Sequence, residues 1–74
     1  MGWARGSEIA DEIWSTIIDK LDLPDYKKAE IALDMVNIFE YTGDCDTMEE
    51  TRFVEDYLFY DSDEDEWKIK EEYE

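Results

Sequence analysis

The stretch DCDTMEETRFVEDYLFYDSDEDE, residues 44–66, decides the fold, because it sets apolar and aromatic side chains among closely spaced carboxylates. Thr47 followed by Glu50 matches a capping box, so a helix is expected to begin at Thr47. Helical spacing predicts a buried row of Met48, Thr51, Val54 or Glu55, and Leu58, beside an aromatic row of Phe53, Tyr57 and Tyr60. The turn-forming run Asp61-Ser62-Asp63 should end this helix near Tyr60.

Two further helices are expected before this stretch. Ser7 suits a helix cap, and two apolar rows follow it at four-residue spacing: Ile9, Ile13 and Ile17 beside Ala10, Trp14 and Ile18. Pro24 suits the start of a second helix over about residues 25–41, and Gly43 suits its end. This second helix is apolar around much of its circumference, which predicts a central position with packing on two sides.

The chain is therefore predicted to be an all-α protein, a three-helix bundle in a single domain, residues 1–74. The helical core is expected over residues 7–60, and an acidic C-terminal segment over residues 61–74. In that segment Trp67-Lys68-Ile69-Lys70 alternates apolar and polar side chains, but no partner strand is evident. The segment is expected to form either a short helix or an extended strand on the core.

Charge gives the strongest indication of function. The chain has 7 basic and 23 acidic residues, a net charge of −16, whereas a small soluble domain typically carries a magnitude of about 2–8. Direct binding to nucleic acid is disfavoured, because phosphate contacts need lysine and arginine, and anionic membranes are disfavoured for the same reason. A basic protein is the favoured partner.

The acids at the expected third helix predict mimicry of a phosphate backbone. Carboxylates on neighbouring helical turns lie about 5–6 Å apart, close to the spacing of successive phosphates on one strand. Exposed aromatic side chains would add contact area, since aromatic residues anchor interfaces. The predicted partner-binding residues are Asp46, Glu49, Glu50, Glu55, Asp56, Tyr57, Tyr60, Asp61, Asp63, Glu64, Asp65, Glu66 and Trp67. The predicted mechanism is steric and electrostatic block of a basic nucleic-acid-binding protein.

Several chemistries are not expected. The single cysteine, Cys45, excludes an internal disulfide, and the lack of histidine argues against a zinc site. Residues 61–72 place acids at the first, third, fifth and twelfth positions of a calcium loop, but Glu66 stands where glycine is required, so only loose cation binding is expected. No cofactor, metal site or enzymatic activity is predicted. No apolar run has the length of a membrane helix, and a cytoplasmic location is expected.

A second reading stays open. The apolar surplus of the second helix, at Met35, Ile38 and Phe39, could bind a partner as an adaptor module or form a homodimer. In that case the charge would serve solubility alone.

The opening Met1-Gly2-Trp3 and the turn Asp44-Cys45-Asp46-Thr47 before an acidic helix resemble small acidic proteins of tailed bacteriophages, a family of unknown function. The resemblance covers about residues 1–56 and transfers no site residue. It implies a phage protein acting in the bacterial host cytoplasm. Small acidic phage proteins are often similar in role to anti-defence inhibitors of host nucleases, restriction systems or CRISPR effectors.

Overall fold

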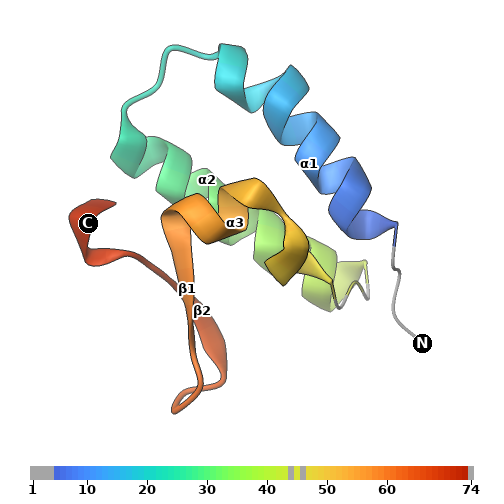
Figure 1. Ribbon diagram of the computed structural model, residues 1–74, viewed down its shortest axis with the longest axis vertical. Coiled ribbons are helices and arrows are strands. Elements are labelled where there is room, and N and C mark those ends of the chain that lie inside the picture. The colour runs from blue at the N-terminus through green and yellow to red at the C-terminus, as the bar shows by residue number, and fades with distance from the viewer. Residues whose placement is uncertain (1–4, 44, 46, 74) are drawn as a thin grey trace.

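A computed structural model describes residues 5–43, 45 and 47–73, which form three α-helices and a β-hairpin (Figure 1). The α-helices and strands are α1 (Gly6–Thr16), α2 (Asp25–Asn37), α3 (Arg52–Tyr57), β1 (Leu58–Asp61) and β2 (Glu66–Ile69). Four short helical turns are η1 (Ile18–Lys20), η2 (Ile38–Thr42), η3 (Met48–Glu50) and η4 (Glu71–Tyr73). Helices α1 and α2 run in opposite directions, and the hairpin projects away from α1 (Figure 1).

Helix α1 buries the second of its two predicted apolar rows. Ala10 is fully buried and Trp14 is 5% exposed, whereas Ile9 and Ile17 face solvent. The predicted Ser7 cap is wrong, because the helix begins at Gly6 and Ser7 lies inside it. The Ser7 hydroxyl instead accepts a hydrogen bond of 3.0 Å from Thr47 Oγ1, which ties α1 to the segment before η3.

The second helix was predicted nearly in full. Helix α2 and the wider turn η2 together cover residues 25–42. Ala29, Ala32 and Val36 are fully buried, and these side chains let α3 pack closely against α2. The Gly43 N–H donates to the Ile38 carbonyl at 3.0 Å and ends the helix as expected.

The predicted continuous helix over residues 47–60 is wrong, because it is interrupted at Thr51. Thr51 has an extended backbone (ψ 148°) between η3 and α3, and its buried hydroxyl donates to the Met48 carbonyl at 2.8 Å. Such a local side-chain bond offers the backbone an alternative to the helical ladder. The expected capping box also fails, since Thr47 makes no side-chain cap bond. The predicted buried row is nevertheless buried at Met48, Thr51, Val54 and Leu58.

The all-α prediction is wrong as well. Leu58–Asp61 pairs antiparallel with Glu66–Ile69, with Leu58 opposite Ile69 and Asp61 opposite Glu66. The sequence suggested no partner strand for the C-terminal segment. That partner is β1, whose first three residues were predicted to end the third helix. Leu58, Phe59 and Tyr60 combine residue types that suit a half-buried pleated surface, and Leu58 alone of the three is buried.

The core lies where α1, α2 and α3 meet. Within it Trp14 and Phe53 form a parallel stack, with ring centroids 4.5 Å apart and planes 5° from parallel. Cys45, Met48 and Val54 are buried around it. The core thus fixes α1 against α3, and side chains of these two helices beside the Trp14–Phe53 stack line the groove described next.

Candidate functional site

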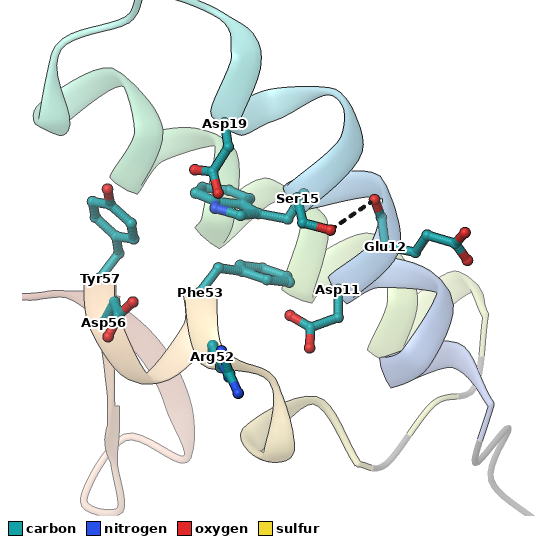
Figure 2. Close-up of a pocket in the computed structure, with 9 residues that line it drawn as sticks. Asp11, Glu12, Ser15, Asp19, Arg52, Phe53, Asp56 and Tyr57 are labelled. Carbon is teal, nitrogen blue, oxygen red and sulfur yellow. Dashed lines mark hydrogen bonds between the residues drawn. The ribbon is translucent and has the colours of Figure 1, made fainter.

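A groove between α1 and α3 brings charged and aromatic side chains together (Figure 2). Its volume is about 560 Å³. It is lined by Asp11, Glu12, Trp14, Ser15, Asp19, Arg52, Phe53, Asp56 and Tyr57. Trp14 and Phe53 supply the apolar floor, and the Tyr57 ring lies tilted against Trp14 with centroids 5.6 Å apart.

Helical spacing explains the polar walls of this groove. Asp11, Ser15 and Asp19 follow one another at four-residue intervals along α1 and η1, and Arg52 and Asp56 stand four residues apart on α3. Residues at this interval share a helix face. The Trp14–Phe53 stack sets these two faces opposite one another, so the groove acquires carboxylates on both sides.

The groove is negative and only partly neutralised. Its ion pair joins Asp19 to Lys28 at 3.9 Å, a long contact between a half-exposed carboxylate and a mostly covered lysine. Arg52 has no carboxylate within 4.0 Å in the part of the chain that the structure describes. In Figure 2, Asp19 lies on one side of the Phe53 ring and Asp11 and Arg52 on the other. Burial, followed by the charge of Asp25, raises the pKa of Tyr57, so its hydroxyl stays protonated at neutral pH.

Carboxylates elsewhere on the surface are also mostly uncompensated. Among the described residues no carboxylate is buried, and only Asp11, Glu40 and Asp61 are partly covered. The ion pairs of the described residues engage Glu8, Asp19, Asp61 and Glu64. The remaining described acids therefore present their charge to solvent without a nearby cation.

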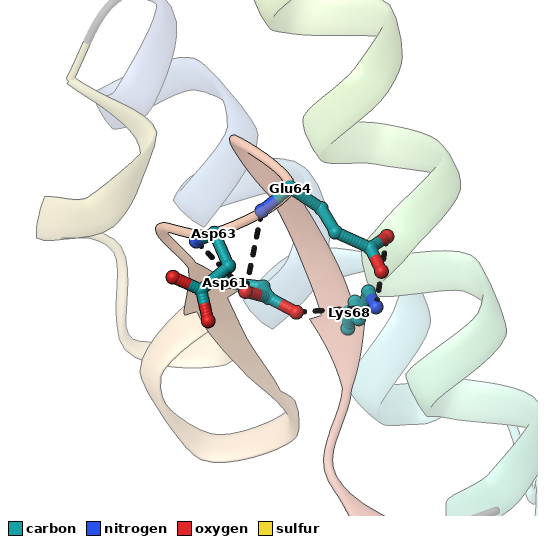
Figure 3. A network of polar contacts seen from close by, with 4 residues as sticks. All are labelled: Asp61, Asp63, Glu64 and Lys68. Carbon is teal, nitrogen blue, oxygen red and sulfur yellow. Dashed lines mark hydrogen bonds and ion pairs between the residues drawn. The ribbon is translucent and has the colours of Figure 1, made fainter.

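The acidic hairpin turn is ordered by one lysine (Figure 3). Lys68 Nζ lies 3.1 Å from Asp61 Oδ2 and 3.0 Å from Glu64 Oε2. The other Asp61 oxygen accepts hydrogen bonds from the backbone N–H groups of Asp63 and Glu64, at 3.0 and 3.4 Å. The Lys68 ammonium lowers the pKa of Asp61 and of Glu64. The acidic run from Asp61 to Glu66 is thus a hydrogen-bonded turn between strands, and it lacks the helix–loop–helix frame of the calcium pattern.

The predicted partner-binding residues line several different hollows. Glu49 lines a hollow with Glu40, Tyr60 and Trp67. Glu50 lines another hollow beside the start of α1, and Asp56 and Tyr57 line the α1–α3 groove. Glu55, Asp63, Asp65 and Glu66 are exposed on α3 and the hairpin. Asp46, like the Met-Gly-Trp opening, lies outside the described residues. Because the helix is interrupted at Thr51, the regular carboxylate spacing expected along residues 47–60 is absent.

Trp67, predicted as a contact anchor, is partly buried and also has a role in the fold. Its Nε1–H donates to Glu40 Oε2 at 3.1 Å, which fastens β2 to η2, and the Tyr60 ring meets it edge-on with centroids 5.4 Å apart. Burial raises the pKa of Glu40, the Trp67 hydrogen bond partly opposes that shift, and the charge of Glu49 adds to it.

Sequence reasoning missed the α1 half of the groove, Asp11, Ser15 and Asp19, and also Arg52 on α3. The four-residue spacing of these polar residues beside the buried Ala10 and Trp14 was visible in the sequence. Their position opposite α3 was not, because it depends on the long-range stack of Trp14 on Phe53.

The chain matches no protein-family model, and no curated protein or solved structure matches it. None of the described helices is long and apolar enough to cross a membrane. Within residues 5–43, 45 and 47–73, no group of three or more acidic or cysteine side chains is arranged to hold a metal ion.

Proposed function

We propose that this protein binds a basic surface of a nucleic-acid-binding protein and keeps nucleic acid off that surface. The observation that carries the proposal is the excess of exposed carboxylates without nearby cations, on a chain of net charge −16. Such self-repulsion destabilises a compact state, so this charge density has a cost in folding that binding to a basic partner would offset. The resemblance to phage proteins suggests a bacterial nuclease, restriction enzyme or CRISPR effector as that partner.

The mechanism is competition for the same cations. A protein that contacts nucleic acid neutralises phosphates with lysine and arginine side chains, and these side chains are equally attracted to carboxylates. Long-range attraction would speed association, and contact at the groove would give the complex a defined orientation. The regular phosphate-like spacing along one helix is not part of this mechanism.

The adaptor alternative has narrower support. Ala29, Ala32 and Val36 of α2 are fully buried in the core, so they are not available to a partner. Ile38 and Tyr41 on η2 remain 57% and 75% exposed, and they are the apolar contacts that an adaptor or a homodimer would use. Binding through them would depend little on salt.

Affinity capture at two salt concentrations separates the two functions. The immobilised protein is incubated with a bacterial lysate at about 50 mM and about 300 mM NaCl, where the Debye length falls from about 14 Å to about 6 Å. The proposal predicts capture of a basic nucleic-acid-binding protein at low salt and its loss at high salt. Capture of no such protein at either salt would sink it, and capture that is insensitive to salt but lost in Tyr41→Ser would favour the adaptor.

A further inference from the structure

The Trp14 side chain is buried, but its indole N–H has no hydrogen-bond acceptor among the described residues. Trp14 is 5% exposed, and its Nε1–H bonds to no acceptor in the part of the chain that the structure describes. No side-chain nitrogen or oxygen of the described residues is both sealed from solvent and unpartnered. This N–H is therefore open to solvent, and the hollow that Trp14 lines is the α1–α3 groove. Because this N–H has no protein acceptor among the described residues, an acceptor atom of a ligand in the groove can replace water as its partner.

The same groove offers places for a cation. Asp11 and Asp19 on one wall and Asp56 on the other are carboxylates, and the half-buried Tyr57 adds an aromatic ring. A guanidinium group is planar, binds carboxylates in a fork and stacks on aromatic rings, whereas an ammonium group does so less well. The groove volume of about 560 Å³ lies within the range of about 300–1,000 Å³ typical of ligand pockets.

We propose that the groove receives an arginine-bearing peptide segment of the basic partner. The carboxylates of Asp11, Asp19 and Asp56 attract the guanidinium group into the groove, and a backbone carbonyl of the segment accepts the Trp14 indole N–H. A peptide unit next to an arginine side chain supplies both an acceptor for the Trp14 N–H and a cation for the carboxylates of the groove. This inference rests on the proposed function, because it names the contact through which the acidic surface meets its partner.

Arg52 gives the proposal a test with the opposite sign. Its side chain lines the groove without a carboxylate partner within 4.0 Å among the described residues, so it repels an incoming cation. Removing this charge should strengthen binding, whereas damage to the fold would weaken it.

The experiment is a titration of the isotopically labelled protein with the peptide acetyl-Gly-Arg-Gly-Arg-Gly-amide at about 20 mM salt, followed by NMR. The indole N–H signal of Trp14 should shift and saturate, and that of Trp67, which is already bonded to Glu40, should not. The matched peptide with citrulline in place of arginine should not bind, and the lysine peptide should bind more weakly. Equal binding by either of these peptides, or an unmoved Trp14 signal, would overturn the proposal.

Variants of equal net charge then separate the groove from general attraction. Asp11→Asn with Asp56→Asn should weaken arginine-peptide binding about fivefold, the effect of two modest ion pairs. Asp63→Asn with Asp65→Asn removes two carboxylates from the hairpin turn and should leave the affinity nearly unchanged, while Arg52→Gln should raise it. Equal weakening by the two double variants would refute a site in the groove, and so would weaker binding by Arg52→Gln. If a captured partner binds the Asp11→Asn/Asp56→Asn variant as tightly as the parent protein, this inference is refuted and the proposed function stands. If the arginine peptide binds but no partner is captured, the proposed function is refuted and the groove site stands.

Discussion

Replacing Phe53 with alanine should bring this protein close to unfolding. Phe53 is 1% exposed and stacks on Trp14 with centroids 4.5 Å apart. Truncation of a buried phenylalanine costs about 3–5 kcal/mol, and a chain of this length has a total unfolding free energy of about 4–11 kcal/mol. Phe53→Ala should therefore remove about 4 kcal/mol, a large share of the total.

Urea denaturation followed by circular dichroism measures this loss. With a denaturant slope of about 1 kcal/mol/M for a small domain, the midpoint should fall by about 4 M, or the variant should be unfolded without urea. Phe53→Leu keeps most of the apolar volume and loses the ring stack, so it should cost only about 1–2 kcal/mol.

Phe59 on β1 provides the matched control. It is the same residue type but is 41% exposed, and Phe59→Ala should cost about 1 kcal/mol or less. Equal losses from Phe53→Ala and Phe59→Ala would refute the placement of the Trp14–Phe53 stack at the centre of the fold.

Three further outcomes follow from the charges. Glu40→Gln keeps an acceptor for Trp67 and should raise the melting temperature at pH 7. Burial raises the folded-state pKa of Glu40, so the stability gained from protonating Glu40 is present below its ordinary pKa and lost as pH rises. The difference in melting temperature between variant and parent should therefore vanish near pH 4. A gap that persists at pH 4 would contradict that cause. Lys68→Met should lower the melting temperature more than Lys70→Met, since Lys68 pairs with two carboxylates of the hairpin, Asp61 and Glu64, and Lys70 has no carboxylate within 4.0 Å among the described residues. Equal losses would show that the turn does not need these two pairs. Raising NaCl from about 20 mM to about 500 mM should stabilise the fold by screening its self-repulsion, and thermal scans that show destabilisation would argue against net repulsion.

Local patterns in the sequence predicted much of the helical fold. The four-residue apolar rows located α1, the Pro24 and Gly43 signals bounded the second helix, and the row from Met48 to Leu58 was correctly assigned to the core. These features depend on neighbours in the chain, so spacing alone reveals them.

Features that depend on distant segments were predicted poorly. Residues 58–60 continue a helical pattern, and only pairing with residues 66–69 makes a strand the better solution. Thr51 interrupts the helix through a side-chain bond that no spacing rule indicates. The groove was missed for a related reason, because its two walls come from segments about forty residues apart, which the Trp14–Phe53 stack brings together.

Displacement of DNA from the captured basic protein is the most direct test of the account. The parent protein and the two double variants, Asp11→Asn/Asp56→Asn and Asp63→Asn/Asp65→Asn, are titrated into a complex of that protein with labelled DNA, and release is followed by fluorescence anisotropy. The account predicts that the parent and the hairpin variant release DNA at similar concentrations, and that the groove variant requires severalfold more. Failure of the parent protein to release DNA at any concentration would contradict the account.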